Sequence, residues 1–279
     1  MLIEIRKVDG LSLRIGQTKA ARTDSPPVLL FNGIGASLEL IEPFAAAMQK
    51  IGITTIAFDA PGAGGSEVPV LPYRLSRLAR LADHLLREMG VIGAVDVLGV
   101  SWGGALAQQF AYQYPERCRR LVLAATSAGA VMVPGKLKAL SKMASPRRYV
   151  DREYMRKVGG QLYGGRLRNE PELMKNYAEL LKPPSSRGYA WQLLAVTGWT
   201  SIFWLRRIRQ KTLVMMGRDD PIVPVVNGRI LTNLLPNARL YTINDGHLFL
   251  MTRTAEVVPV IRDFLLESEV HAVTGTNRA

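Results

Sequence analysis

Hydrophobic and polar positions along the chain follow two alternating periodicities. Short apolar runs typical of buried strands recur up to residue 126 and again after residue 210. Between them lie segments such as 73–89, whose leucines recur every three to four positions on one helical face. The expected strands are 2–8, 11–15, 27–32, 53–59, 94–100, 121–126, 212–217 and 240–244. Strands that alternate with helices predict a mostly parallel sheet covered by helices on both faces.

The alternation breaks near the middle of the chain. From Ser127 to about Arg209 no segment has the pattern of a strand, and helical segments rich in Met, Tyr and Trp follow one another. We therefore expect residues 1–127 and 210–279 to form an α/β core, with 128–209 inserted as a helical cap. The predicted cap begins directly after the strand 121–126. The most informative motif of the chain lies at the end of the strand before that one.

That motif is Gly99-Val100-Ser101-Trp102-Gly103, a G-x-S-x-G box. A predicted strand precedes it directly and a good helix former follows it, which is the context that a nucleophile elbow requires. A bare G-x-S-x-G box is also compatible with an ordinary glycine turn. The strand–box–helix order favours a catalytic serine, with the Ser101 hydroxyl exposed at the tight turn.

A serine hydroxyl needs a base, and the chain has three histidines, His84, His247 and His271. His84 precedes the serine on a predicted helix, and His271 lies in a polar C-terminal tail that we expect to be frayed. His247 follows the last predicted strand and comes last in a Ser, Asp, His order, so we expect it to be the general base.

The acid should follow the strand before that of His247, where Asp219 and Asp220 compete. Asp220 is joined to a Pro-Ile-Val-Pro run and matches the usual placement, so it is our candidate to orient the imidazole. Asp219 is expected to cap its own turn or the next helix.

The oxyanion hole should combine two backbone N–H groups. One is that of Trp102, directly after the nucleophile and at the start of a helix. The other is expected from the loop 32–35, at Ile34. Asn32 stands where many relatives of this architecture have His, and it is a candidate to brace the loop. Because the elbow residue is serine, aspartate-based dehalogenase and epoxide hydrolase chemistry is disfavoured, and acyl transfer without metal or cofactor is expected.

Composition narrows the function further. The 279 residues carry a net charge of +13, but the basic residues are scattered without an aromatic-interleaved stripe, which argues against nucleic-acid binding. Cys118 is the single cysteine and we interpret it as a packing residue. No uncharged apolar run is long enough to span a bilayer, and the N-terminus has no secretory signal pattern, so we expect a cytoplasmic protein.

Several blocks of the chain resemble intracellular medium-chain-length poly(3-hydroxyalkanoate) depolymerases, which have the α/β-hydrolase fold. The blocks include the elbow with its Gly-Gly-Ala-Leu-Ala-Gln-Gln-Phe helix, the cap segments 130–136, 143–150 and 198–202, and 245–250. The resemblance implies an eight-stranded sheet with an inserted cap, and cleavage of the ester bonds of this polyester to 3-hydroxyalkanoic acids or oligomers. It also implies peripheral association with polyester granules, to whose anionic coat the positive charge is suited.

Aromatic residues of the predicted cap suit an apolar pocket over Ser101, or simply pack the cap against the core. The candidates for substrate contact are Trp199, Trp204 and Tyr189. The alternative activity is that of a soluble medium-chain carboxylesterase or lactonase of the same fold. A non-catalytic granule-coating protein and a secreted depolymerase are weaker alternatives, and the sequence leaves the oligomeric state open.

Overall fold

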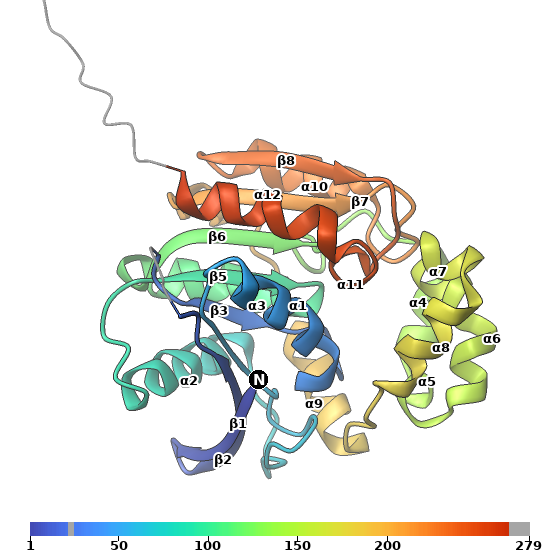
Figure 1. Cartoon of the computed structure of the whole chain (residues 1–279), viewed down its shortest axis with the longest axis horizontal. Helices are drawn as coiled ribbons and strands as arrows, with labels where there is room; N and C mark the ends of the chain where they lie inside the picture. Colours follow the sequence, from blue (N-terminus) through green and yellow to red (C-terminus); the bar gives the residue numbers. More distant parts are fainter. Residues whose placement is uncertain (22–24, 268–279) are drawn as a thin grey trace, which may run out of the picture.

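Eight strands form one sheet through the middle of the molecule, shown in Figure 1 for the computed structural model, which describes residues 1–21 and 25–267. Their order is β1-β2-β4-β3-β5-β6-β7-β8. All neighbouring pairs from β4 to β8 are parallel, and β1 and β2 are antiparallel to their neighbours. The predicted mostly parallel, eight-stranded sheet is confirmed. The strands are β1 (Leu2–Val8), β2 (Leu11–Thr18), β3 (Val28–Phe31), β4 (Thr55–Phe58), β5 (Val95–Val100), β6 (Cys118–Ala124), β7 (Lys211–Gly217) and β8 (Ala238–Ile243).

The central strands form from apolar segments that are buried in the sheet, and a tight turn joins β1 to β2. Every residue of β3 and β4 is buried, as expected for parallel strands that are covered on both faces. At the edge, Asp9 and Gly10 turn β1 into β2 with φ angles of 48° and 82°. β2 runs three residues beyond the predicted end at Ile15 because its second half also pairs with β4. The predicted tail with His271 lies outside the described residues.

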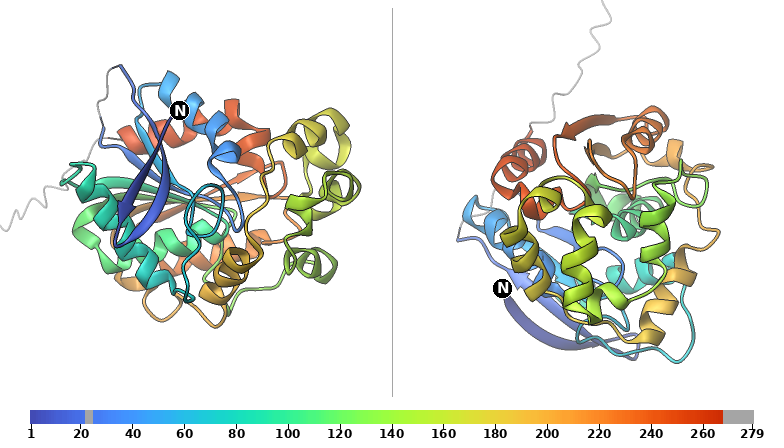
Figure 2. Two further views of the ribbon diagram at one scale, coloured as in Figure 1. Left: turned by 90° about the horizontal axis from the view of Figure 1, so that it is seen from below. Right: turned by 90° about the vertical axis from the view of Figure 1, so that its right-hand side faces the viewer.

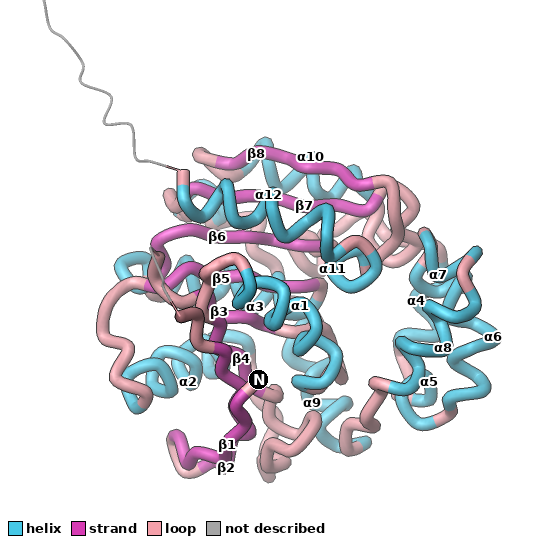
Figure 3. The backbone as a smooth tube through the Cα atoms, in the orientation of Figure 1, coloured by secondary structure: helices cyan, strands magenta, loops and turns pink. Residues whose placement is uncertain are grey.

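Helices cover both faces of the sheet, as the magenta strands between cyan helices in Figure 3 show. One face carries α1 (Leu38–Lys50), α11 (Phe249–Thr252) and α12 (Thr254–Leu266), and the other carries α2 (Leu75–Glu88), α3 (Trp102–Gln113) and α10 (Val225–Leu234). The leucine face that predicts α2 is buried against the core. Gly90, with a φ of 74°, follows the end of this helix. Short 3-10 turns lie at Pro115–Arg117 and Leu205–Arg207.

Six further helices connect β6 to β7. In Figure 1 the helices α4 to α8 lie to the right of the sheet, beyond the carboxyl ends of the strands, and α9 lies below α1; the right view of Figure 2 shows this segment in front of the sheet. The only bridge in this segment is an isolated one between Gly129 and Thr200. The helices are α4 (Leu137–Met143), α5 (Arg147–Val150), α6 (Arg152–Tyr163), α7 (Arg166–Asn169), α8 (Pro171–Glu179) and α9 (Ser186–Val196). Among the described residues, no helix combines the length and apolarity that crossing a bilayer requires.

Candidate active site

Ser101 lies on the sharp turn from β5 to α3 in a conformation that L-residues rarely adopt. Its φ is 53° and its ψ is −116°. The backbone around it is fixed from the next strand, because the Ser101 N–H donates to the Ala124 carbonyl at 2.8 Å and the Thr126 hydroxyl donates to the Ser101 carbonyl at 2.7 Å. Strain of this kind persists only where the surroundings hold it, and it is typical of catalytic positions.

The two glycines that frame Ser101 let the helix approach the sheet closely. A Cβ atom on Gly99 would lie 2.2 Å from the carbonyl oxygen of Gly103, and one on Gly103 would lie 2.2 Å from that of Phe31. Neither position therefore tolerates a side chain. Glycine is therefore required at both ends of the box, because only glycine allows the close packing that holds the strained turn in place.

His247 and Asp220 form a buried pair at the same edge of the sheet. Asp220 follows β7 and His247 follows β8, and His247 Nδ1 lies 2.7 Å from Asp220 Oδ2. The other carboxylate oxygen of Asp220 accepts the N–H groups of Ile222 and Val223 at 2.8 and 2.9 Å. The turn therefore fixes the carboxylate and leaves one oxygen for the imidazole, whose tautomer it selects. His84 is half-exposed on α2, where its Nδ1 lies 2.7 Å from Asp9.

Asp219 has a different role from the predicted one. It was expected to cap its own turn or the next helix, but Asp220 makes those turn contacts. Asp219 instead accepts the Gly165 N–H at 2.8 Å and pairs with Arg168 at 2.7 Å, and its side chain is about two-fifths exposed. The side chains of these two neighbouring residues therefore make different contacts: Asp219 contacts the inserted helices, and Asp220 contacts His247.

The loop 32–35 lies at the same cavity as Ser101, which Asn32, Gly33 and Ile34 also line. Asn32 braces this loop, since its side chain accepts the Gly33 N–H and donates to the Ser37 carbonyl, both at 2.9 Å. Within the described residues, the Ile34 N–H donates no hydrogen bond of its own. The Trp102 N–H stands at the first position of α3, where helix geometry leaves donors without an intrahelical acceptor. Both candidate donors of the oxyanion hole therefore remain available to a substrate oxygen.

The inserted helices contact the residues that carry both of these donors, and no sequence motif predicts these contacts. From α9, Gln192 accepts the Gly35 N–H at 2.7 Å, and its carbonyl accepts the indole N–H of Trp102 at 2.9 Å. From α5, the Tyr149 hydroxyl donates to the Ile34 carbonyl at 2.6 Å. The insertion therefore sets the position of the peptides that would bind a developing oxyanion.

Two cavities meet at Ser101. The first, about 60 Å³, is lined by Ser101, His247, Arg148, Tyr149, Tyr163 and Tyr177, and we call it the His247-side cavity. The second, about 340 Å³, is lined by Ser101, Trp102, Met132, Leu193, Trp199 and Ile222, and we call it the Trp199-side cavity. Ile34 and Met143 line both. In the described chain, no group of three or more His, Cys, Asp or Glu side chains is placed to hold a metal ion.

Only one of the three aromatic candidates for substrate contact lines a cavity. Trp199 does so, while its indole N–H donates to Gln109 at 3.0 Å. Trp204 stacks on Tyr112 at 4.4 Å between ring centroids and lines neither cavity. Tyr189 is buried behind the His247-side cavity, where its hydroxyl contacts Arg148 and Met143. Trp204 and Tyr189 support the walls of the site, because both are committed to packing and hydrogen bonds.

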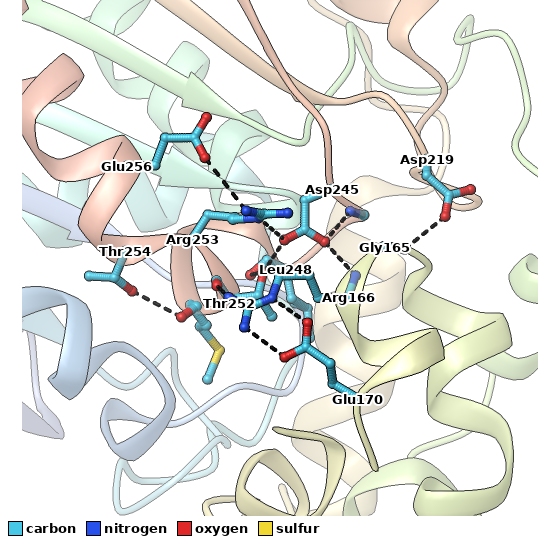
Figure 4. Close-up of polar contacts among 12 residues, drawn as sticks. Gly165, Arg166, Glu170, Asp219, Asp245, Leu248, Thr252, Arg253, Thr254 and Glu256 are labelled. Atoms are coloured by element: carbon cyan, nitrogen blue, oxygen red, sulfur yellow. Dashed lines mark hydrogen bonds and ion pairs between the residues drawn. The ribbon is translucent and has the colours of Figure 1, made fainter. Parts of the chain in front are cut away.

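The turn between α6 and α7 is joined to the loops that carry Asp220 and His247, as Figure 4 shows. Asp245 accepts the N–H groups of Gly246 and Arg166 at 2.7 and 2.8 Å with one oxygen, and the Thr252 hydroxyl at 2.7 Å with the other. The His247 N–H donates to the Tyr163 carbonyl at 2.7 Å. The inserted helices therefore help to fix the position of the imidazole.

We expect Gly165→Ala to lower kcat by roughly 10- to 100-fold, because displacements of about 1 Å cost that much at reacting groups. Gly165 has a φ of 55°, and a Cβ atom on it would lie 1.8 Å from Asp245 Oδ1. Gly198→Ala is the matched control. Its φ is 71° and nothing lies within 4 Å of the added atom, so it introduces backbone strain alone. Steady-state ester hydrolysis and thermal unfolding of both variants test this. Equal losses of kcat in the two variants would refute the role of the α6–α7 turn in positioning the loop of His247.

The fold is that of an α/β hydrolase, and comparison places the chain in a family. A model of the alpha/beta hydrolase fold family matches residues 26–254, and the chain belongs to this family.

More specifically, the chain is 50% identical over 267 residues to the poly(3-hydroxyalkanoate) depolymerase of Ectopseudomonas oleovorans, which covers 96% of this chain and 93% of that protein. The resemblance stated from the sequence blocks is thereby confirmed. This chain is also 26% identical to 3-oxoadipate enol-lactonase 2 of Acinetobacter baylyi, over 81% of this chain and 84% of that protein. The solved enol-lactonase from Burkholderia xenovorans LB400 superposes with a TM-score of 0.81 at 22% identity, covering 95% and 100% of the two chains.

Proposed function

We propose that the protein hydrolyses the ester bonds of medium-chain-length poly(3-hydroxyalkanoate) and releases 3-hydroxyalkanoic acids or short oligomers. The observation that carries this proposal is the 50% identity to a poly(3-hydroxyalkanoate) depolymerase, because it spans 96% of the chain and so includes the insertion as well as the core. The two cavities that meet at Ser101 support it, since most of their lining residues are apolar or aromatic and suit the alkyl side chains of such a polyester.

Ser101, His247 and Asp220 are the proposed catalytic triad. Ser101 Oγ attacks the ester carbonyl carbon while its proton passes to His247, and the N–H groups of Ile34 and Trp102 stabilise the oxyanion. The bond to the alcohol oxygen then breaks, and His247 returns the proton to that oxygen. Water next attacks the acyl-enzyme with the same base, which frees the acid and restores the Ser101 hydroxyl. Asp220 holds the imidazole and stabilises its charged form without taking the proton.

Residues 128–209 are proposed to act as the cap of this site, over a core formed by 1–127 and 210–279. The contacts of Gln192 and Tyr149 with the oxyanion loop support this division, as do the walls that α5, α6 and α8 contribute to the His247-side cavity. A cap that both encloses substrate and positions catalytic groups excludes water from the reacting ester.

Association with the polyester granule in the cytoplasm is proposed to occur through the mouth of the Trp199-side cavity. Two exposed apolar residues directly adjoin lining residues of this cavity in the sequence: Leu194, 51% exposed, follows Leu193, and Val131, 50% exposed, precedes Met132. Phe203 and Leu137, which are 84% and 80% exposed, lie four and three positions from the lining residues Trp199 and Leu140. Apolar side chains exposed together are typical of binding surfaces. The net charge of +13 favours adsorption to an anionic granule coat, and this contribution should weaken with salt.

Hydrolysis of soluble medium-chain esters or lactones is the second candidate, favoured by the 26% identity to an enol-lactonase. Incubation with emulsions of medium-chain and short-chain polyester, beside p-nitrophenyl octanoate, separates the two. We expect clearing of the medium-chain emulsion, release of 3-hydroxyalkanoic acids, and protein that sediments with the emulsion at low salt. Turnover of the soluble ester with an untouched polymer would contradict the depolymerase proposal.

A further inference from the structure

Arg148 carries a charge into the His247-side cavity that no carboxylate of the described residues neutralises. It lines this cavity with Ser101 and His247, yet the residue is only 1% exposed. Its hydrogen bonds all go to neutral oxygens: the Tyr189 hydroxyl at 2.8 Å, the Met143 carbonyl at 3.3 Å and the Ile34 carbonyl at 3.4 Å. Its Nε is buried without a hydrogen-bond partner among the described residues. Arginine side chains that are buried this deeply usually have an acidic partner.

The surrounding tyrosines do not supply a counter-charge. The rings of Tyr149 and Tyr189 lie 4.6 and 5.5 Å from the guanidinium carbon, which stabilises the cation but leaves its charge in place. Burial raises the pKa of Tyr163 to about 12 and also raises the pKa values of Tyr177 and Tyr189, so these hydroxyls stay neutral. An arginine side chain remains protonated even when buried. The cavity therefore carries a net positive charge beside the candidate nucleophile.

The cavity that holds Arg148 is the one into which the alcohol half of the ester should enter. A catalytic histidine returns its proton to the leaving oxygen, so the leaving group lies on the histidine side of the serine. His247 lines the cavity of Arg148 and does not line the Trp199-side cavity. In a poly(3-hydroxyalkanoate), the leaving unit is a 3-hydroxy acid, whose carboxyl carbon is three bonds from the ester oxygen. At the end of the polymer that carboxyl group is free and anionic.

We propose that Arg148 binds the terminal carboxylate of the 3-hydroxyalkanoate unit that leaves, so that the enzyme works from the carboxyl end of the chain. The inference rests on the proposed depolymerase function. The terminal unit occupies the smaller His247-side cavity, and the remaining polymer extends through the larger Trp199-side cavity. The guanidinium binds a carboxylate through charge-assisted hydrogen bonds, and its Nε has no hydrogen-bond partner among the described residues. The same group holds the released 3-hydroxy acid, which makes the product a competitive inhibitor.

A matched pair of soluble substrates tests the proposal: the linear dimer of 3-hydroxyoctanoic acid as the free acid and as its primary amide, which has the same shape without the charge. We expect kcat/KM of the wild type to be about 10- to 100-fold higher for the acid, the range for a hydrogen bond to a charged group. Arg148→Met should bring the ratio of acid to amide close to one, and Arg148→Lys should keep part of it. Arg147→Met, which removes an exposed charge next to Arg148, should leave the ratio unchanged.

Equal kcat/KM values of the wild type for acid and amide would overturn the proposal. So would an Arg148→Met variant that lowers both by the same factor, because that is the effect of a purely supporting role at Ile34 and Tyr189. A measurement on the wild type alone avoids any folding defect of the variant: 3-hydroxyoctanoate should inhibit p-nitrophenyl octanoate hydrolysis at least about 10-fold more tightly than 3-hydroxyoctanamide. Equal inhibition constants overturn the proposal. Preference for the acid dimer with untouched polymer would instead refute the depolymerase function and retain the carboxylate site.

Discussion

Ser101→Ala should lower kcat for every ester substrate by about 10⁴- to 10⁶-fold, the range found when the nucleophile of a serine triad is removed. The substitution deletes only Oγ. Alanine is an L-residue like serine, so the strained φ of 53° and the hydrogen bonds of the backbone with Ala124 and Thr126 remain as they are. Initial rates with p-nitrophenyl octanoate and with polymer emulsion measure the loss.

The same variant separates catalysis from binding. Ser101→Ala should unfold at a temperature close to that of the wild type and should still sediment with the polyester emulsion, because the exposed apolar residues around the Trp199-side cavity are unchanged. Residual hydrolysis at a tenth of the wild-type rate would remove Ser101 from the nucleophile role. Unaltered activity together with binding would point to a contaminating hydrolase and to a chain that only coats the polymer.

Asp220→Asn should lower kcat by about 10⁴-fold, since an amide in this position favours the wrong imidazole tautomer and leaves the imidazolium uncompensated. The geometry allows the substitution, because Asp220 Oδ1 accepts the Ile222 and Val223 N–H groups and an asparagine oxygen can do the same. The side chain amide then faces His247 Nδ1 in place of the carboxylate oxygen at 2.7 Å. Steady-state kinetics on p-nitrophenyl octanoate, with thermal unfolding as a check, measure the effect.

Asp219→Asn is the matched control for this variant. Its carboxylate is half-exposed, and exposed ion pairs such as that with Arg168 contribute little. The asparagine oxygen can still accept the Gly165 N–H. We therefore expect a change in kcat of less than about threefold. If Asp219→Asn instead proved the more damaging of the two, the assignment of the acid would have to be exchanged between the neighbours.

The sequence was sufficient to assign the candidate triad to one edge of the sheet, because each residue lies in the loop that follows a recognisable strand. Ser101, Asp220 and His247 follow β5, β7 and β8, and the carboxyl ends of parallel strands meet at one edge of a sheet. Asp220 could also be chosen over Asp219 from its position in the turn. The exact partner of Asp219 could not be predicted, since Gly165 lies 54 residues away in the insertion.

The walls of the site depend on contacts that no local pattern contains. Gln192 reaches Gly35 across 157 positions of the sequence, and Arg148 reaches Ile34 across 114. Aromatic character alone does not distinguish a cavity wall from packing, which is why Trp204 and Tyr189 were expected in contact with substrate. Tyr177 on α8 lines the His247-side cavity, which exists only when the insertion is folded against the core, so no local sequence pattern identifies its role.

The contacts of Asp219 and Asp245 with the α6–α7 turn determine which parts of this protein can be exchanged with a relative. Gly165 and Arg166 donate to carboxylates that stand one and two residues from Asp220 and His247, and the Tyr163 carbonyl accepts from His247 itself. A chimera that replaced 128–209 alone would leave those carboxylates facing foreign backbone. Three segments therefore depend on one another: 163–168, 219–220 and 245–253. We expect an exchange of the cap to change the substrate range only when all three segments are taken from the same relative.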